Sequence, residues 1–365
     1  MTSSDFLTDR ADLLHTHWAR VPKADRPPGG IAVALERFAL TSNNLTYAKF
    51  GEELGYWNYF PGPPGWGRVP VWGIGRVMES DGDGPAEGER IYGFFPISES
   101  LTMLPWSLAE RDFVDGAPHR AELSSTYNEY VRIDRDPAYD ESCADAYLAL
   151  RPLFSLGFFL AAWLDEQAFF GARRVIVSSA SSKTAAALAD QLRGRVERIG
   201  LTSSVRRKLV EQGDRFERVI AYGELDDESH LTESPAIFID IAGDPEIRGA
   251  VHRRLGSMLV RSIRVGATRG GPEARELGAA DDLPGPKPEF FFTPMHILRL
   301  HERWGRAVLR DRLSASLSAF LRGSASWLRY EILAGKAEIA NAYGALARGA
   351  APADSAAILT APGRD

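Results

Sequence analysis

The sequence contains almost no cysteine, the residue on which disulfides and many zinc sites depend. Its 365 residues include one cysteine, Cys143, and seven histidines. A single cysteine excludes an internal disulfide and a zinc site built from cysteines. Two of the scattered histidines, His296 and His301, are five residues apart, a spacing that diverges on a helix rather than sharing one face. We therefore expect no bound metal.

The chain also lacks an excess of basic residues and an apolar run of membrane-spanning length. Its formal net charge of −6 argues against a general nucleic-acid binder, because affinity for phosphate backbones comes from clustered Lys and Arg. The longest apolar stretch, around Leu153–Leu164, is interrupted by polar residues and is too short to span a bilayer. The chain does not open on a charged and then apolar leader, so we expect a cytoplasmic location.

The chain is long enough for two domains, and the spacing of its apolar residues changes near residue 148. Residues 30–135 hold short apolar runs separated by Gly, Pro and Asp, which predicts hairpins or a small barrel. Beyond residue 148, strands rich in Val, Ile and Phe alternate with helices, which predicts a doubly wound parallel sheet covered on both faces. In the last part, residues 326–339 read as an amphipathic helix, and residues 335–349 and 356–362 predict one helix and one strand.

Residues 173–192, with the sequence RRVIVSSASSKTAAALADQL, have the layout of a phosphate-binding strand, loop and helix, but without glycines. The small residues Ser179, Ser182 and Ala185 have the spacing of a dinucleotide-binding loop. In such a loop, N–H groups at the start of the helix bind a pyrophosphate. Ser181 would add a hydroxyl donor and Lys183 a cation.

Two other interpretations of the same loop stay open. The Lys183–Thr184 pair suggests a triphosphate-binding loop, although its glycine positions hold Val177 and Ser182. In that case Asp240, at the end of an apolar strand, would imitate the aspartate that holds magnesium. Alternatively, the loop is a serine-rich turn in which Ser181 or Ser182 caps a helix.

The next two strands end in residues suited to a 2′-phosphate. The second strand is followed by Thr202, Ser203 and Arg206 with no acidic residue among them, and the third is followed by Tyr222. An acid at this point favours NAD, whereas hydroxyl donors and a guanidinium favour NADP. An ordinary polar helix start with a half-buried tyrosine would give the same pattern.

Several segments taken together resemble the medium-chain dehydrogenase/reductase superfamily, in its zinc-free, quinone-oxidoreductase-like branch. They are SNNLTYAKFG, VPVWGIGRVMES, GERIYGFFP, YNEYVRI, VIVSSASSKTAAALA and the closing GALARG with AAILT. Within this superfamily the chain is most similar to the family named domain of unknown function 2855. The loop departs from the superfamily pattern in having no glycine, and the catalytic cysteine of zinc-dependent members is absent.

The resemblance implies an α/β fold with two parts, a partly open GroES-like β-barrel catalytic domain and a Rossmann dinucleotide-binding domain. We place the catalytic domain at residues 1–147, the Rossmann domain at 148–322, and a return to the catalytic domain at 323–365. The expected cofactor is NADPH, bound by the loop residues and the 2′-phosphate group. This set consists of Ser179, Ser181, Ser182, Lys183, Thr184, Thr202, Ser203, Arg206 and Tyr222.

The resemblance also implies that an asparagine and a tyrosine in TSNNLTYAKFG carry the chemistry. Tyr47 would protonate or hydrogen-bond a substrate oxygen, and Asn43 or Asn44 would orient the substrate or the nicotinamide ribose. The alternative is that the asparagines form a turn through their own hydrogen bonds and that Tyr47 packs in the barrel. Aromatic residues nearby could line an apolar substrate pocket or pack the loop; they are Trp57, Tyr59, Phe60 and Trp66.

From these features we expect an NADPH-dependent, zinc-independent oxidoreductase that reduces a carbonyl or an activated C=C bond. Its partner would be an apolar or aromatic small molecule, with no nucleic acid and no membrane span. The alternative function is a cofactor-binding protein without catalysis, acting as a sensor or scaffold. A homodimer formed through an edge strand near residues 262–267 would fit the resemblance.

Overall fold

The computed structural model describes residues 2–227, 231, 233–265 and 283–361. The chain divides into two compact units, one formed by Met1–Arg151 with Ser314–Asp365 and the other by Pro152–Leu313. Helices α2 (Ala144–Glu166) and α7 (Arg306–Ser324) each contribute residues to both units. The units are described separately below.

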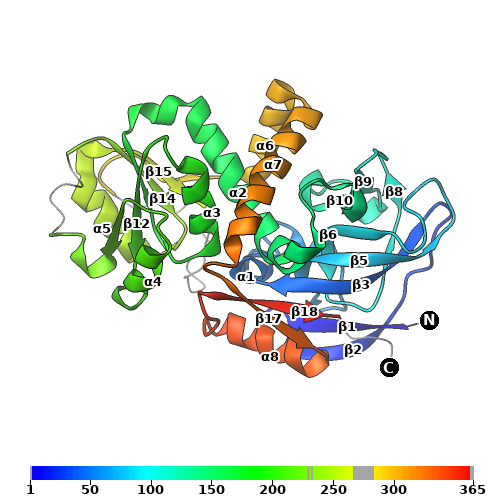
Figure 1. Ribbon diagram of the computed structural model, residues 1–365. Helices are drawn as coiled ribbons and strands as arrows, with labels where there is room; N and C mark the ends of the chain where they lie inside the picture. The colour runs from blue at the N-terminus through cyan, green and yellow to red at the C-terminus, as the bar shows by residue number, and fades with distance from the viewer. Residues whose placement is uncertain (1, 228–230, 232, 266–282, 362–365) are drawn as a thin grey trace. The chain divides into compact units, whose positions relative to one another are not determined.

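The second unit is built on a parallel sheet of six strands. Its order is β13-β12-β11-β14-β15-β16. Figure 1 labels β12, β14 and β15 of this sheet. The strands are β11 (Arg174–Val177), β12 (Glu197–Thr202), β13 (Arg218–Ala221), β14 (Ala236–Asp240), β15 (Leu259–Arg264) and β16 (Glu289–Phe290). Strand β11 comes first in the chain and lies at the centre, with the next strands on one side and the later ones on the other. This is the strand order of dinucleotide-binding sheets, and the point beside β11 where the order reverses is where their ligands bind.

Helices join three pairs of successive strands of this sheet, as parallel pairing requires. Helix α3 (Lys183–Leu192) lies between β11 and β12, α4 (Arg207–Gln212) between β12 and β13, and α5 (Pro245–Leu255) between β14 and β15, whereas α6 (Thr293–Trp304) follows β16. All four residues of β11 and all five of β14 are buried. Helix α2 packs closely on α3, because a Cβ added to Gly157 would lie 2.8 Å from the backbone nitrogen of Leu188.

The first unit is strand-rich. Its larger sheet has the order β17-β18-β3-β5-β6-β10-β9-β8, with β7 also paired to β3, and a smaller sheet has the order β2-β1-β4. The longest strands are β3 (Ile31–Leu40) and β5 (Pro70–Ser80); the others are β1 (Thr2–Asp9), β2 (Thr16–Pro22), β4 (Trp66–Gly67), β6 (Arg90–Pro96), β7 (Leu101–Met103), β8 (Pro105–Trp106), β9 (Asp112–Asp115), β10 (Glu129–Arg132), β17 (Arg329–Ala334) and β18 (Ser355–Thr360). Strands β17 and β8 end the order without pairing to each other, so in the described residues this sheet is open.

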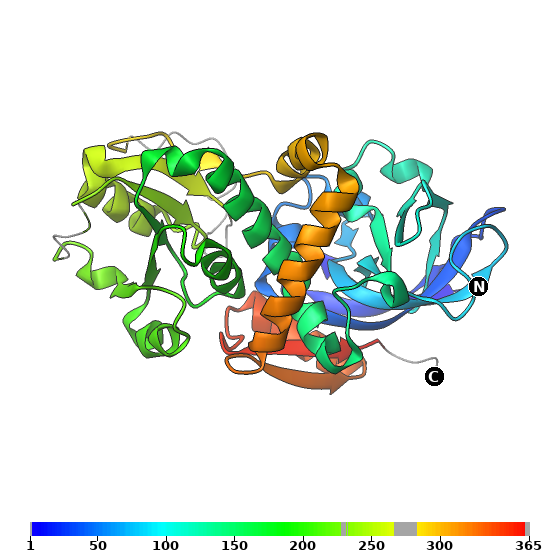
Figure 2. The same ribbon diagram turned by 45° about the horizontal axis from the view of Figure 1, so that its top comes forward.

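The fold class predicted from the sequence is confirmed: one unit is strand-rich and the other contains a doubly wound parallel sheet. The predicted closing helix and strand are also present, as α8 (Lys336–Ala347) and β18. Helix α8 lies against β17 and β18 (Figures 1 and 2). Its buried residues Ile339 and Tyr343 belong to the core of the first unit.

Two local predictions were wrong. Residues 326–339, expected as one helix, form strand β17, which ends before Gly335, and only then the start of α8. Strand β17 pairs in parallel with β18 over its whole length, and Gly335 at φ 91° ends it. The segment TSNNLTYAKFG, in which one interpretation has the asparagines forming a turn, contains helix α1 (Ser42–Lys49), because Thr41 and Asn44 cap its first turn.

The dimer edge expected near residues 262–267 is not an edge in the described part of that strand. Strand β15 pairs with β14 on one side and with β16 on the other, where Ile263 faces Glu289. Residues 266 and 267 lie outside the described residues.

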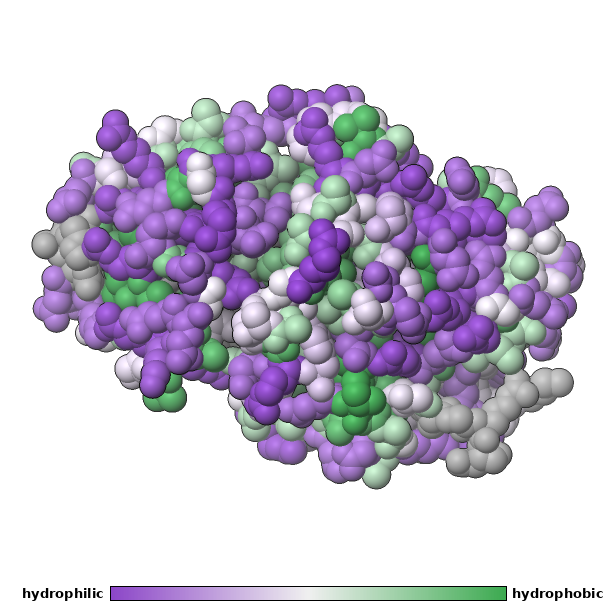
Figure 3. All heavy atoms as spheres, in the orientation of Figure 1, coloured by the Kyte–Doolittle hydropathy of each residue, from purple (hydrophilic) through white to green (hydrophobic). Residues whose placement is uncertain are grey.

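One helical stretch, Glu141–Glu166, is long and apolar enough to cross a membrane, but 67% of its apolar window is buried inside the structure. A core helix of a folded domain meets the same criteria. On the face shown in Figure 3, hydrophilic side chains predominate and hydrophobic ones form small separate groups.

The close approach of α2 and α3 gives a stability prediction. Gly157→Ala should lower the free energy of unfolding by about 1–3 kcal/mol, because the new methyl group meets backbone atoms that cannot move aside. Gly249→Ala in α5 is the matched control, since its nearest neighbour is the flexible end of Arg253 at 3.0 Å. Thermal unfolding of both variants measures the difference, and equal melting temperatures would contradict it.

Candidate functional site

The loop between β11 and α3 has the backbone turn that a glycine usually provides. Ser179 has a φ of 53°, in the left-handed region that residues other than glycine rarely adopt. The turn is fixed by three hydrogen bonds. The N–H groups of Ser179, Ala180 and Ser182 donate to Tyr222 Oη, the Leu201 carbonyl and the Ser179 carbonyl at 2.8, 2.9 and 2.8 Å. The loop therefore makes a left-handed turn at a serine, at a position where glycine is the usual residue.

The start of α3 presents unpaired backbone donors. Ser182 is the N-cap, and its Oγ accepts from the N–H of Ala185 at 3.2 Å. Within the part of the chain that the structure describes, the N–H groups of Ser181 and Thr184 have no acceptor. Lys183 and Thr184 open the helix and are both half-buried. Such donors, together with the helix dipole, favour an anion at this point.

A buried polar network holds the ends of β11 and β14 together. Ser178 is fully buried, and its Oγ donates to Asp240 Oδ1 at 3.0 Å. The same oxygen accepts from the N–H groups of Ile241 and Ala242 at 2.9 and 3.0 Å. Asp240 also forms a buried ion pair with Arg248 at 3.0 Å. Ser178 therefore joins the central strand to its neighbour directly below the loop.

This network overturns the triphosphate interpretation of the sequence. That interpretation needs the Asp240 carboxylate for magnesium. In the structure, Asp240 Oδ1 instead accepts hydrogen bonds from Ser178 Oγ and the N–H of Gly243, and Oδ2 accepts one from Arg248. A fully buried carboxylate with these partners is part of the fold and does not face a ligand.

The end of β12 brings Arg206 to the loop. Its Nη1 lies 3.4 Å from Ser181 Oγ, so the guanidinium and the start of α3 share one edge of the sheet. The neighbouring Arg207 is differently placed, because Glu224 and Glu211 bind its guanidinium at 2.8 and 2.9 Å. Ser203 is half-buried, whereas Thr202 is almost fully buried. Among the residues predicted for the 2′-phosphate, Ser203 and Arg206 thus lie most openly at this edge.

Tyr222 follows β13 and reaches the loop itself. Its hydroxyl accepts the hydrogen bond from Ser179 that closes the left-handed turn. The residue is half-buried. Its position ties the third strand to the loop after the first strand, a contact that the sequence pattern did not indicate.

In the first unit, Tyr47 lies in a cluster of aromatic rings. Its Oη accepts from Asn43 Nδ2 at 2.6 Å and from Trp72 Nε1 at 2.9 Å. Rings around it come from β5, β6 and two short helical turns, η1 (Tyr56–Asn58) and η3 (Ser125–Tyr127). The rings in contact with Tyr47 belong to Tyr56, Phe94 and Tyr127. Tyr47 is buried, while Asn43, Trp72 and Tyr127 are half-buried and form the more open side of the cluster.

Burial keeps the phenols of this cluster neutral. It raises the pKa of Tyr47 well above its usual value of 10.0, against the smaller lowering effect of the Trp72 and Asn43 donors. Burial likewise raises the pKa values of Tyr56, Tyr59 and Tyr127. The site therefore offers phenolic protons at neutral pH rather than negative charge.

Asn44 has a different place from Asn43. It is buried, its Oδ1 accepts from the N–H of Thr41 at 2.7 Å, and its Nδ2 donates to the Pro70 carbonyl at 2.8 Å. Both ends of the amide are thus bonded to backbone, which fixes the start of α1 to β5. Because the residue is also buried, its amide serves the fold in this arrangement.

The loop aromatics considered as a pocket lining pack the interior instead. Trp57, Tyr59 and Phe60 are all buried. A Cβ added to Gly51 would lie 2.1 Å from Trp57, which shows how closely this side chain is enclosed. Trp66 is half-buried and packs on His15 and His17.

The sequence interpretation missed Ser178, Arg248 and Trp72. Nothing in the pattern marks Ser178 apart from the serines beside it. Trp72 stands in an apolar strand, where a tryptophan is an ordinary core residue. Only the pairing of β5 with its neighbours shows that its indole N–H faces Tyr47.

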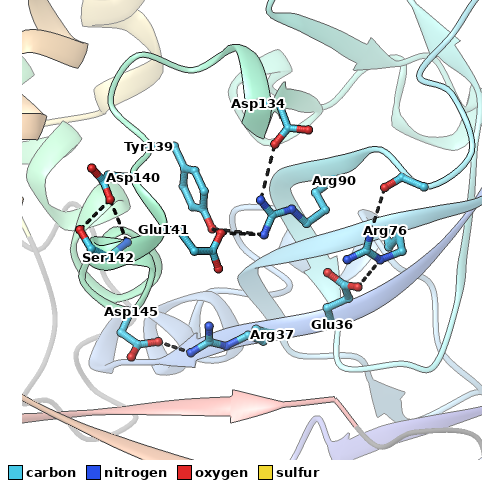
Figure 4. A network of polar contacts seen from close by, with 11 residues as sticks. Glu36, Arg37, Arg76, Arg90, Asp134, Tyr139, Asp140, Glu141, Ser142 and Asp145 are labelled. Atoms are coloured by element: carbon cyan, nitrogen blue, oxygen red, sulfur yellow. Dashed lines mark hydrogen bonds and ion pairs between the residues drawn. The ribbon is translucent and has the colours of Figure 1, made fainter.

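Another polar cluster of the first unit is an ion-pair network rather than a site (Figure 4). Arg37 pairs with Asp145, Arg76 with Glu36 at 2.5 Å, and Arg90 with Asp134 and Glu141 at 3.5 and 3.0 Å. The Asp134 and Glu141 side chains are 68% and 67% exposed, so these charges are solvated. Among the described residues, no group of three or more His, Cys, Asp or Glu could hold a metal ion.

Known proteins were compared with this chain by sequence and by structure. Residues 38–352 match the model of a family described as protein of unknown function, DUF2855. No curated protein matches the sequence. Many solved structures share the fold over nearly the whole chain.

Three of these structures illustrate the likeness. CurA from Vibrio vulnificus, in complex with NADPH, has a TM-score of 0.61 at 11% identity and covers 99% of this chain and 100% of its own. A putative NADPH:quinone reductase from Mesorhizobium loti has a TM-score of 0.61 at 13% identity, with 98% of each chain covered. The yhdH oxidoreductase from Salmonella enterica, in complex with NADP, has a TM-score of 0.55 at 14% identity and covers 98% and 99%. At these identities the likeness establishes a shared fold.

The left-handed serine gives a second stability prediction. Ser179→Gly should be more stable than Ser179→Ala by about 1–2 kcal/mol, because only glycine adopts a positive φ without steric cost. The same pair of substitutions at Ser181, whose φ is not positive, should show the opposite order or no difference. Thermal unfolding compares the four variants, and a more stable alanine at position 179 would rule out the strained turn.

Proposed function

Since the chain belongs to the DUF2855 family, we propose that it is an NADPH-dependent oxidoreductase that acts without zinc. It would reduce a carbonyl or an activated C=C bond of an apolar substrate. One observation carries the proposal: the start of α3 and the Arg206 guanidinium meet at the carboxyl edge of the sheet, beside the strand where its order reverses. Dinucleotides bind at this point in sheets of this order.

The pyrophosphate would lie at the start of α3. The N–H groups of Ser181 and Thr184 are donors without acceptors among the described residues, and they follow directly after the left-handed turn at Ser179. The side chains of Ser181, Ser182, Lys183 and Thr184 belong to the same stretch. The residues present therefore fit a dinucleotide, although the loop contains no glycine.

The 2′-phosphate would be bound at the end of β12. Ser203 and Arg206 are the proposed ligands, with Thr202 behind them. Arg207 is not one of them, because two glutamates already hold its guanidinium. For Tyr222 we propose support of the loop through the Ser179 N–H rather than direct phosphate binding. The absence of an acid after β12 favours NADPH over NADH.

The chain's own catalytic group would be Tyr47 with Asn43. Bound NADPH supplies a hydride. Tyr47 would donate a proton to the substrate oxygen, or hydrogen-bond to it, and its raised pKa keeps the phenol protonated at neutral pH. Asn43 holds the phenolic oxygen from the preceding turn of α1. We leave Asn44 out of the catalytic group, because it is buried and each end of its amide is bonded to backbone.

The likeness to structures crystallised with NADPH or NADP, and to a putative NADPH:quinone reductase, supports the proposed cofactor and reaction class. The aromatic cluster around Tyr47 supports an apolar or aromatic substrate, because rings provide large contact area with few polar groups. The cytoplasmic location and the homodimer stay predictions.

Cofactor preference tests the ribose assignment. The protein should bind NADPH much more tightly than NADH. Arg206→Ala should weaken NADPH binding about 10- to 100-fold, the effect of losing ~1.5–3 kcal/mol of charge-assisted hydrogen bonding. Arg207→Ala is the matched control and should leave the preference unchanged. Fluorescence titration with both nucleotides measures these affinities, and equal affinity of the intact protein for NADPH and NADH would count against the assignment.

Turnover tests the proposed chemistry. Tyr47→Phe should lower kcat about 10²- to 10⁴-fold, because it removes the proton donor. NADPH affinity should stay the same, since the cofactor ligands lie elsewhere in the chain. A panel of enones, quinones and aldehydes with NADPH oxidation as the readout provides the measurement. Tight NADPH binding with no turnover across the panel would instead favour the sensor or scaffold function.

A further inference from the structure

The hydroxyl of Tyr47 receives two hydrogen bonds. Trp72 Nε1 lies 2.9 Å from Tyr47 Oη and Asn43 Nδ2 lies 2.6 Å from it. An indole N–H can only donate, so the phenolic oxygen must be the acceptor toward Trp72. With the amide of Asn43 as the second donor, the O–H hydrogen of Tyr47 points to neither of them. No further hydrogen-bond partner of Tyr47 is found among the described residues.

Trp72 is held in the orientation that this contact needs. It lies on β5, and its ring stacks on Tyr92 of β6, with centroids 5.6 Å apart and planes inclined by 18°. The Trp72 ring also contacts the rings of Phe94 and Tyr127. Tyr92 is in turn fixed by the guanidinium of Arg151, 4.9 Å from the centre of its ring. Because these contacts restrict the indole ring, its N–H is aimed at Tyr47 before any substrate arrives.

We propose that Trp72 is a positioning residue for the reaction: its indole N–H holds Tyr47 Oη as an acceptor and so directs the phenolic proton to the substrate oxygen. This inference rests on the proposed function. In the step, the O–H bond of Tyr47 breaks and an O–H bond forms on the substrate oxygen as the substrate π bond opens, and the substrate carbon would take the hydride that bound NADPH supplies. The phenolate left behind keeps two hydrogen-bond donors and then regains a proton from water.

The two donors matter because the phenol is buried. Burial raises the pKa of Tyr47, which makes proton donation harder, whereas the Trp72 and Asn43 donors lower it. Hydrogen bonds to a charged group are stronger than those to a neutral one. The Trp72 N–H therefore stabilises the phenolate more than the phenol, and it should accelerate the step that produces the phenolate.

The first test compares two tryptophan variants in turnover. Trp72→Phe should lower kcat about 10- to 100-fold, as expected for losing one hydrogen bond to a developing charge, with KM and NADPH affinity nearly unchanged. The solvent deuterium isotope effect on kcat should rise, because proton donation becomes slower. Trp18→Phe is the matched control, since it also removes an indole hydrogen bond of this unit, from Nε1 to the Lys336 carbonyl at 3.1 Å. It should change neither quantity.

A second measurement does not depend on turnover. With 3,5-difluorotyrosine at position 47, the fluorine NMR signal reports ionisation of that phenol alone. Trp72→Phe should raise its titration midpoint and Trp18→Phe should not. If Trp72→Phe does not fold, Trp72→benzothienylalanine keeps the two-ring shape and lacks the N–H.

The outcomes separate the two proposals. A raised midpoint with a lowered kcat supports both. A raised midpoint in a protein that turns over no substrate of the panel supports the contact but overturns the proposed function, and with it the role in catalysis. An unchanged midpoint, or a kcat that falls equally in both tryptophan variants, overturns the role of Trp72.

Discussion

One buried polar network decides the geometry of the candidate cofactor edge. Ser178 Oγ binds the Asp240 carboxylate and two N–H groups beyond β14, and Asp240 binds Arg248. A buried carboxylate must have such partners, because an unpaired charge in the interior is very costly. The network fixes the ends of two parallel strands at the point where the strand order reverses. The turn at Ser179 and the start of α3 follow directly from that fixed end.

The loop after β11 makes a left-handed turn without a glycine. The glycine normally found at such a turn supplies a positive φ, and Ser179 adopts that conformation without being glycine. The strain is compensated by the hydrogen bonds to Tyr222 and Leu201 that surround the turn. A residue from the end of the third strand has thereby become part of the loop after the first one. The backbone donors at the helix start are what the proposed dinucleotide would need, and these donors do not depend on the side chains.

The proposed catalytic group of the first unit lies among neutral side chains. Neutral hydrogen-bond donors and aromatic rings surround Tyr47, in place of a metal or a charged acid. In such surroundings a phenol stays protonated and can act as an acid only if its conjugate base is stabilised locally. The asparagine one helical turn away and the tryptophan on β5 meet this condition from two separate elements.

The alternation of buried β-branched strands with helices was enough to predict the parallel sheet, because helices must cover both its faces and join its strands. Spacing alone also located the loop at 178–184 and the hydroxyl and guanidinium groups after β12. Tertiary pairing decided the rest. No residue of strand β17 is buried, and the strand exists because β18 pairs with it along its whole length, so residues 326–339 read wrongly as a helix. The sequence also does not show which groups hydrogen-bond to each other. The amide of Asn44 bonds to backbone groups of Thr41 and Pro70, whereas the amide of the adjacent Asn43 donates to the hydroxyl of Tyr47.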